Sequence, residues 1–120
     1  MKILVVDDSK VMRMMVIRTL RQAGFDGHAI QEAGDGKAAL ETINSFGPDL
    51  VMSDWNMPEL NGIDFLKALR ALGKTTPFVF VTSEGTDEMR QIANAEGAQA
   101  LISKPFTPDT FETTLRGFLQ

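Results

Sequence analysis

Short runs of hydrophobic residues alternate along the chain with segments of helical periodicity. Four runs contain no polar residue, as expected of strands that are buried on both faces of a parallel sheet. These runs are residues 3–6, 50–52, 78–81 and 101–102. A fifth segment, residues 28–33, mixes polar and apolar residues, which is typical of a strand at the edge of a sheet. The pattern therefore predicts five strands.

Between these runs, apolar residues recur with the spacing of amphipathic helices. In the first such segment the residues that share one face are Met12, Met15, Val16, Thr19 and Leu20. Arg13, Arg18 and Arg21 lie off this face, and the methionines on it are interpreted as core-filling residues. The later segments carry shorter stripes, which are Ala39, Leu40 and Ile43; Phe65, Leu66 and Leu69; Met89, Ile92 and Ala93; and Phe111, Leu115 and Phe118. The spacing predicts five helices, one after each strand.

A glycine stands between each of the first four helical segments and the strand that follows it. The four positions are Gly24, Gly47, Gly73 and Gly97. Because glycine adopts the left-handed conformation that commonly ends a helix, we interpret them as helix C-caps. Strand–helix units joined by short, right-handed connections form an α/β fold with a doubly wound parallel sheet. We expect a (βα)5 architecture in a single domain over residues 1–120, with no internal repeat.

Composition narrows the classes of function. The 120 residues include 12 Lys and Arg, 16 Asp and Glu, one His and no Cys, for a net charge of −4. The cysteine count excludes disulfides, Fe–S clusters and thiol nucleophiles, and one histidine cannot form a zinc site alone. The acidic balance argues against nucleic acid or an anionic membrane as the main partner. The longest uncharged segment, residues 75–83, is too short to span a membrane, so we expect a cytoplasmic protein.

Chemically reactive side chains follow four of the predicted strands. They are Asp7 and Asp8, Asp54, Thr82 and Ser83, and Lys104 before Pro105. In open α/β sheets, ligands bind at the carboxyl ends of the strands, so these groups are expected to converge. Three carboxylates without softer ligands favour a hard divalent cation, and Mg²⁺ more than Ca²⁺. Such a pocket can accept a phosphoryl group, and a carboxylate can act as the nucleophile that forms an aspartyl phosphate.

Each of these residues also has a simpler structural interpretation when it is taken alone. Asp8, with Ser9, can cap the first helix, and Asp54 can occupy a turn. Thr82 can simply end a strand, and Lys104 can be solvated. The shared position at strand ends favours the chemical interpretation. His28 is expected to be structural or solvated.

Several motifs spread over nearly the whole chain form one combined pattern. They are Ile-Leu-Val-Val-Asp-Asp at residues 3–8, Ser-Asp-Trp-Asn-Met-Pro at 53–58, Gly62, Val-Thr at 81–82 and Lys-Pro-Phe at 104–106. Together they resemble the receiver domain of bacterial two-component response regulators, most of all the stand-alone chemotaxis type. The resemblance implies a flavodoxin-like, five-stranded sheet with strand order 2-1-3-4-5.

The resemblance also implies a phosphoacceptor and a metal site. Asp54 would accept a phosphoryl group from the phosphohistidine of a sensor histidine kinase, or from a small phosphodonor. Asp8, Asp54 and the backbone carbonyl of Asn56 would bind Mg²⁺, or Mn²⁺ in its place. Asp7 would act on the metal through a bound water.

Further residues receive roles from the same resemblance. Lys104 and Thr82 would each contact a phosphoryl oxygen, and Thr82 would shift inward on phosphorylation. The Lys104–Pro105 bond is implied to be cis. Asn56 and Glu84 occupy the positions that tune dephosphorylation.

One position departs from the family pattern. The switch residue three positions before the lysine is usually aromatic, and here it is Leu101. Either coupling from Thr82 to the last helices runs through aliphatic repacking, or the output surface differs from that of the flagellar-motor regulator. Met14 and Ile17 are apolar but lie off the first helical stripe. They form either a docking face for a helical phosphotransfer partner or ordinary exposed apolar residues.

We therefore expect a monomeric, non-enzymatic signalling switch rather than an enzyme. Phosphorylation would alter the surface of the fourth helix, fifth strand and fifth helix, which binds a protein partner. With the chain ending at residue 120, no effector domain is expected. Within this hypothesis, a chemotaxis regulator, a phosphorelay intermediate served by a histidine phosphotransfer protein, and the receiver part of a longer regulator all remain open.

Two other classes fit the sequence less well. A phosphatase of the haloacid dehalogenase type also uses an aspartyl nucleophile with Mg²⁺, but its Asp-x-Asp motif is absent after the first strand. A flavin-binding module needs hydroxyl and amide donors after that strand to hold its phosphate. The carboxylates of Asp7 and Asp8 would repel that phosphate.

Overall fold

The computed structural model describes residues 2–25 and 27–117, which alternate between parallel strands and helices. The strands are β1 (Lys2–Val6), β2 (Ala29–Ala33), β3 (Leu50–Ser53), β4 (Phe78–Thr82) and β5 (Ala100–Ser103). The helices are α1 (Lys10–Gln22), α2 (Gly36–Phe46), α3 (Gly62–Ala71), α4 (Asp87–Ala95) and α5 (Pro108–Leu115). All ten predicted elements are present, and each strand lies within two residues of its predicted bounds.

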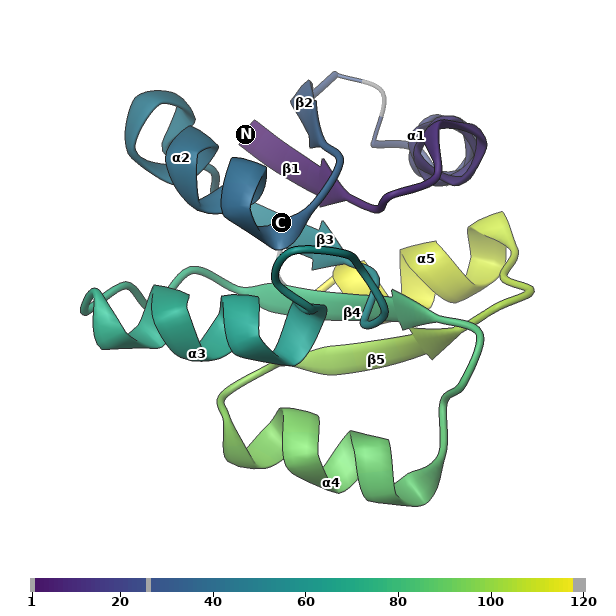
Figure 1. Ribbon diagram of the computed structural model, residues 1–120. Helices are drawn as coiled ribbons and strands as arrows, with labels where there is room; N and C mark the ends of the chain where they lie inside the picture. The colour runs from purple at the N-terminus through teal and green to yellow at the C-terminus, as the bar shows by residue number, and fades with distance from the viewer. Residues whose placement is uncertain (1, 26, 118–120) are drawn as a thin grey trace.

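The five strands form one parallel sheet in the order β2-β1-β3-β4-β5, so the expected strand order is confirmed. β1 lies between β2 and β3: its residue Ile3 pairs with Ile30 on one side and with Leu50 on the other. Helices α1 and α5 cover one face of the sheet, and α2, α3 and α4 cover the other (Figure 1). β2 and β5 are the edge strands, as the mixed polarity of residues 28–33 predicts for β2.

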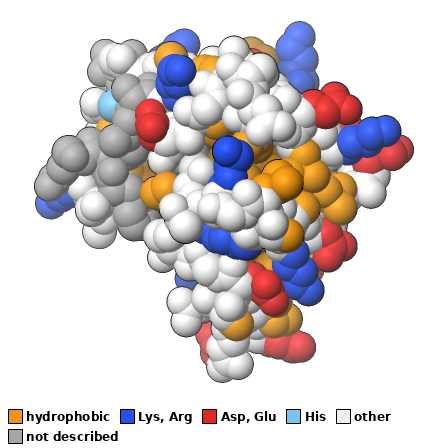
Figure 2. Space-filling model, turned by 90° about the vertical axis from the view of Figure 1, so that its left-hand side faces the viewer, with side chains coloured by type: hydrophobic (Ala, Val, Ile, Leu, Met, Phe, Trp, Pro, Cys, Tyr) orange, Lys and Arg blue, Asp and Glu red, His pale blue; other side chains and the backbone are white. Residues whose placement is uncertain are grey.

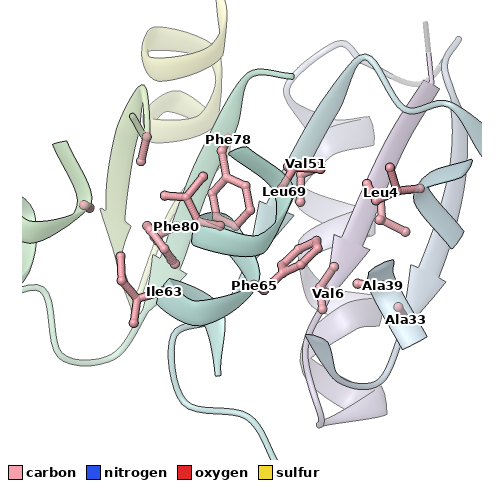
Figure 3. Close-up of a cluster of buried hydrophobic side chains, with 14 of the residues drawn as sticks. Leu4, Val6, Ala33, Ala39, Val51, Ile63, Phe65, Leu69, Phe78 and Phe80 are labelled. Carbon is pink, nitrogen blue, oxygen red and sulfur yellow. The ribbon is translucent and has the colours of Figure 1, made fainter. Parts of the chain in front are cut away.

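Each face of the sheet has its own hydrophobic core. Phe65 of α3 and the two β4 residues Phe78 and Phe80 dominate one core. The Phe65–Phe78 ring centroids are 5.4 Å apart, and the Phe78–Phe80 centroids are 4.9 Å apart (Figure 3). The other core joins Val16 and Leu20 of α1 to residues of α5 and of the central strands. Burial on both faces explains why the central strands contain so few polar residues.

Every helix begins at a residue whose side-chain oxygen accepts a hydrogen bond from the backbone N–H three positions later. These N-caps are Ser9, Asp35, Asn61, Thr86 and Thr107. The four glycines predicted at helix ends all have positive φ, between 63° and 98°. Gly47 is itself a C-cap residue, whereas the other three stand one position beyond the cap. The helix stops were therefore predicted to within one residue.

Some predicted core residues are not in the core. Met15 is 48% exposed and Ile92 is 39% exposed, so the interpretation of both as buried positions was wrong. Phe118 lies outside the described residues. Ile17, which lay off the predicted stripe, is partly buried and packs against the α1–α5 core, whereas Met14 is 58% exposed. The apolar face of α1 thus extends beyond the surface that the sheet covers.

Within residues 2–25 and 27–117, no helix has the length and apolarity required to cross a membrane. Figure 2 shows the end of the molecule where the strands begin, which is the left-hand side of Figure 1. Lys and Arg side chains are interspersed there with Asp and Glu side chains, without a large patch of one sign. A concentration of like charges lies instead at the carboxyl ends of the strands.

Candidate functional site

Three carboxylates meet beyond the ends of β1 and β3. Asp7 and Asp8 follow β1, and Asp54 follows β3, which is its hydrogen-bonded neighbour. Each side chain offers one oxygen, and these three oxygens lie within 4.8 Å of one another. The backbone N–H of Asp54 donates to the carbonyl of Val6 at 2.9 Å, so the pairing of β1 with β3 places Asp54 beside Asp7. The expected convergence of the three acids is present.

Lys104, which follows the edge strand β5, completes the cluster. The ammonium nitrogen of Lys104 lies 3.3 Å from Oδ2 of Asp7 and 3.8 Å from Oδ2 of Asp54. The Lys104 side chain is only 15% exposed. Its backbone N–H donates to the carbonyl of Thr82 at 2.8 Å, and the Lys104–Pro105 bond is cis, as the resemblance implied. The cluster therefore contains three negative groups and one positive group.

Asp54 lies deep in this cluster, with a side chain that is 12% exposed. Burial raises the pKa of its carboxyl group, Lys104 opposes that rise, and the nearby Asp7 carboxylate adds to it. Oδ1 accepts a hydrogen bond from the backbone N–H of Trp55 at 2.8 Å. Oδ2 is the oxygen that faces Lys104. One oxygen of Asp54 is thus fixed by the backbone while the other points into the charged cluster.

Asp7 is anchored through four different atoms and is only 4% exposed. Its backbone N–H donates to the carbonyl of Ala33 at 3.1 Å, and its own carbonyl accepts from Nη1 of Arg13 at 2.7 Å. Its Oδ1 accepts from the backbone N–H of Ser9 at 2.9 Å, and its Oδ2 faces Lys104. Two of these partners therefore hold the buried carboxylate of Asp7, and the other two hold its backbone.

Asp8 is exposed and has a different environment. The cap of α1 is Ser9, whose hydroxyl accepts from the N–H of Met12, so Asp8 does not have the capping role that it could have had. Within the described part of the chain, Asp8 forms no hydrogen bond through its backbone or its side chain. Together with Asn56 it lines an open depression of about 520 Å³ beside the cluster.

The loop that carries Asp54 closes against a glycine at the start of α3. The N–H of Gly62 donates to the carbonyl of Trp55 at 2.7 Å. A Cβ atom at Gly62 would lie 2.2 Å from the carbonyl oxygen of Asp54 and 2.9 Å from the ring of Phe80. Trp55 covers the same ring, with a distance of 4.7 Å between the Trp55 and Phe80 centroids. Gly62 therefore allows the Asp54 loop to approach α3 and β4 closely.

Thr82, Asn56 and Glu84 lie on the β4 side of the site. Thr82 is fully buried, and its hydroxyl accepts from the backbone N–H of Glu84 at 3.3 Å. The side-chain amide of Asn56 donates to Oε1 of Glu84 at 3.4 Å, which links the β3 and β4 loops. Ser83, the neighbour of Thr82, is exposed.

Leu101 occupies the position at which the sequence departs from the family pattern. It is 8% exposed and belongs to the core beside α3 and α4. A Cβ at Gly85 would lie 3.1 Å from its Cδ2 atom and 2.1 Å from Oγ of Ser103, so the β4–α4 loop rests directly on β5. Nη1 of Arg90 donates to the Leu101 carbonyl at 2.9 Å. The β4–α4 loop thus packs against an aliphatic side chain at this position.

The donor set suits a hard divalent cation. All three side chains of the cluster offer carboxylate oxygens, and oxygen-only sites with few protein ligands favour Mg²⁺. Clustered carboxylates repel one another unless a positive charge compensates them, and Lys104 alone cannot neutralise three. The residues present therefore fit a bound divalent cation.

Sequence reasoning overlooked one residue close to the cluster. Arg13 lies off the apolar stripe, yet its side chain is only 16% exposed and reaches the Asp7 carbonyl and Oε1 of Glu32. Helical periodicity describes how side chains are distributed around α1, but a long arginine can cross over the helix N-terminus to the adjacent loop. The only signal in the sequence is an arginine within two turns of the paired acids.

Comparison with known proteins supports a family relationship. The sequence model of the response regulator receiver domain family matches residues 3–116. The chain is 42% identical over 117 residues to chemotaxis protein CheY-3 of Vibrio cholerae, covering 96% of this chain and 88% of that protein. It is 43% identical over 110 residues to chemotaxis protein CheY of Pseudomonas aeruginosa, covering 89% and 86%, respectively.

Solved structures give the same picture. The crystal structure of the Vibrio cholerae chemotaxis protein CheY4 superimposes with a TM-score of 0.86 at 39% identity, covering 98% of both chains. The receiver domain of Francisella response regulator 1452 superimposes with a TM-score of 0.84 at 30% identity, covering 98% of this chain and 94% of that one. The similarity thus extends over the whole sheet and all of its helices.

Proposed function

The chain belongs to the response regulator receiver domain family, and we propose that it accepts a phosphoryl group on Asp54 and thereby changes a protein-binding surface. The observation that carries this proposal is the arrangement around Asp54. Its Oδ2 faces the Lys104 ammonium group at 3.8 Å, and two further carboxylates lie beside it. A nucleophilic oxygen next to a cation and a metal-binding cluster is the arrangement that phosphoryl transfer to a carboxylate requires.

Asp8, Asp54 and the backbone carbonyl of Asn56 would hold Mg²⁺, or Mn²⁺ in its place, and Asp7 would act as an indirect ligand. When bound, the cation supplies positive charge that offsets the carboxylates and the incoming phosphoryl group. Without that charge, the acidic cluster would repel a dianionic group. The proposal therefore includes a strict requirement for a divalent cation.

The transfer proceeds by attack of Asp54 Oδ2 on phosphorus. A bond forms from oxygen to phosphorus, and the bond from phosphorus to the donor breaks; for a phosphohistidine donor the leaving imidazole nitrogen keeps the electron pair and takes up a proton. Lys104 pairs with one phosphoryl oxygen, and the buried Thr82 hydroxyl binds another. Because both groups already lie at the carboxyl ends of the strands, little reorganisation is needed before transfer.

Receiver domains are signalling regulators rather than metabolic enzymes. We assign this chain only catalysis of its own phosphorylation and dephosphorylation. Asn56 and Glu84 are proposed to tune dephosphorylation, because their side chains meet across the mouth of the site at 3.4 Å. Neither the phosphatase nor the flavin-binding alternative is supported by an observation, and the matched family differs from both.

We propose chemotaxis-type signalling as the pathway, because the curated relatives at 42–43% identity are named chemotaxis proteins. The phosphodonor would be a sensor histidine kinase or a histidine phosphotransfer protein. The output would be a protein that binds the surface of α4, β5 and α5, next to Leu101. A cytoplasmic, monomeric state without nucleic acid binding remains part of the proposal.

An apolar groove along α1 is the proposed docking site of the phosphodonor. It has a volume of about 590 Å³ and is lined by Val11, Met14, Met15, Ile17, Arg18, Arg21 and Glu32. Met15 also lines a second groove, which it shares with Lys104 and Phe106, so the apolar surface continues to the edge of the charged cluster. The arginines favour a partner helix whose apolar face has an acidic border.

The experiment that tests the proposal is phosphorylation by acetyl phosphate with Mg²⁺, followed by intact-protein mass spectrometry. We expect addition of one phosphoryl group that hydroxylamine removes, and no addition in EDTA. Asp54→Asn should abolish the labelling, whereas the control Asp64→Asn, an exposed acid on α3, should retain it. Undiminished labelling of Asp54→Asn would refute the assignment.

A further inference from the structure

The position of Asp8 depends on the peptide unit that joins it to Asp7. Asp8 is exposed, and among residues 2–25 and 27–117 none forms a hydrogen bond with it. The bonds that order this loop are those of its two neighbours, Asp7 and Ser9. The peptide unit between Asp7 and Asp8 is planar, so fixing the Asp7 carbonyl oxygen also fixes the plane from which the Asp8 backbone starts.

The Asp7 carbonyl is held by one side chain. Nη1 of Arg13 donates to it at 2.7 Å, and Nε of the same guanidinium group donates to Oε1 of Glu32 at 2.9 Å. The guanidinium group is planar, so two bonds made through different nitrogens define its orientation. Glu32 belongs to β2, and Asp7 follows the neighbouring strand β1. Arg13 therefore connects the acid-bearing loop to the edge strand of the sheet.

We propose that Arg13 is a positioning residue for the cation site, which acts by orienting the Asp7–Asp8 peptide and through it the Asp8 carboxylate. The inference deepens the proposed function and rests on the divalent-cation binding that this function includes. Arg13 itself carries a positive charge and is not a cation ligand. Its contribution is to limit the conformations of Asp8, which forms no hydrogen bond of its own within the described part of the chain.

Charge alone predicts the opposite effect on metal affinity. Arg13 is positive and lies beside the acidic cluster, so its removal should strengthen the attraction of the cluster for a cation. If Arg13 positions Asp8, its removal should instead weaken binding, because Asp8 then has to be ordered when the cation binds. The two explanations therefore differ in the sign of the change, and one titration can separate them.

The experiment compares Arg13→Met with the unchanged protein and with Arg18→Met, which removes the same charge from an exposed position of α1. Mg²⁺ binding is followed through the fluorescence of Trp55, the only tryptophan, whose backbone N–H donates to Asp54. We expect Arg13→Met to weaken binding about 10-fold, the lower end of the effect typical of residues that orient metal ligands. Arg18→Met should bind as tightly as the unchanged protein or more tightly. Equal or tighter binding by Arg13→Met would overturn the proposal.

A second measurement needs no metal. The N–H of Ser9 donates to Asp7 Oδ1 inside this loop, so its hydrogen exchange in EDTA reports on the order of the loop. We expect faster exchange of this amide in Arg13→Met than in Arg18→Met, and equal rates would refute the role of Arg13. If the fluorescence of the unchanged protein does not respond to Mg²⁺, the proposed metal site fails, and this exchange comparison still decides on Arg13.

The conservative variant Arg13→Lys tests the proposal even if Arg13→Met does not fold. Arg13→Lys keeps the charge but cannot bind the Asp7 carbonyl and Glu32 through a planar fork. We expect it to fold and to show a weaker Mg²⁺ affinity, because charge is retained and orientation is lost. Mg²⁺ affinity equal to that of the unchanged protein would show that charge alone matters at this position and would overturn the proposal.

Discussion

The ammonium nitrogen of Lys104 lies 3.3 Å from Oδ2 of Asp7, although the two residues are 97 positions apart in the chain. Lys104 comes closer to this buried acid than to Asp54, where the distance is 3.8 Å. The Lys104 ammonium group is therefore shared by two carboxylates in the unphosphorylated protein. Its loss should affect the stability of the resting protein as well as phosphorylation.

We expect Lys104→Met to lower the free energy of unfolding in EDTA by about 1–3 kcal/mol, because Asp7 then remains buried without its ionic partner. Urea unfolding followed by circular dichroism measures this change. The control is Lys67→Met, which removes an exposed lysine of α3 and should leave stability nearly unchanged. Equal stability of the two variants would mean that the Lys104–Asp7 pair contributes nothing measurable.

Asp8→Asn should have the opposite effect on stability. It removes one of three mutually repelling carboxylates, and it removes no helix cap because Ser9 caps α1. We expect the metal-free protein to gain about 1 kcal/mol, the scale of a close charge pair in water. Labelling by acetyl phosphate should be lost at the same time. A loss of stability relative to the exposed control Glu41→Gln would contradict the repulsion that we infer.

The raised pKa of Asp54 predicts a pH dependence of the metal-free protein. Burial favours the protonated carboxyl group in the folded state, so its stabilising contribution is fully present below the pKa of the unfolded chain, about 4. That contribution is lost as the pH rises through the higher pKa of the folded state. Asp54→Asn should therefore have a higher unfolding free energy than the unchanged protein. This difference should grow as the pH rises from the pKa of the unfolded chain to that of the folded state. Urea unfolding in EDTA at a series of pH values tests this, and a constant difference would contradict it.

Gly62→Ala should disturb the site through sterics alone. The added methyl group would lie 2.2 Å from the Asp54 carbonyl oxygen, so the loop has to move. We expect a loss of about 1–3 kcal/mol in unfolding free energy, together with a change in Trp55 fluorescence. Gly117→Ala is the matched control, because a Cβ there would meet no atom of the described residues within 4 Å. Similar stabilities of the two variants would show that the loop accommodates a methyl group freely.

Met14→Glu tests the groove along α1. A charge in the middle of an apolar docking surface should slow phosphotransfer from a histidine kinase or phosphotransfer protein roughly 10-fold. Labelling by acetyl phosphate needs no docking and should not change. The control Leu72→Glu places the same charge at an equally exposed position, since Leu72 is 59% exposed and Met14 is 58% exposed. If both variants slow phosphotransfer equally, the groove is not the docking site.

The sheet could be predicted because its strands obey a simple physical rule. Strands covered on both faces must be apolar throughout, and chemically reactive residues then mark their carboxyl ends. This rule was sufficient to bring Asp7, Asp54 and Lys104 to one place. The strand order came from the resemblance, since the pattern of residues does not show which strands are neighbours.

Periodicity was less reliable where a helix is only partly covered. Met15 shares the face of Val16 and Leu20, but it lies in the first half of α1, next to the Phe106 loop rather than the strands. Ile92 lies on α4, which packs on the edge strand β5, and there only Ala93 is fully buried. The contact between Arg13 and Asp7 depends on the path of a long side chain, which helical spacing does not describe.

The left-handed glycines follow helices and precede strands, so they lie at the end of the sheet where the strands begin, opposite the carboxylates. A Cβ at Gly73 would meet no atom of residues 2–25 and 27–117 within 4 Å, so this part of the structure leaves room at the turn. The chain contains no cysteine, so a single cysteine at Lys74 or Thr75 would be its only thiol. A dye attached there could report on partner binding in solution while the chemistry at the other end proceeds undisturbed.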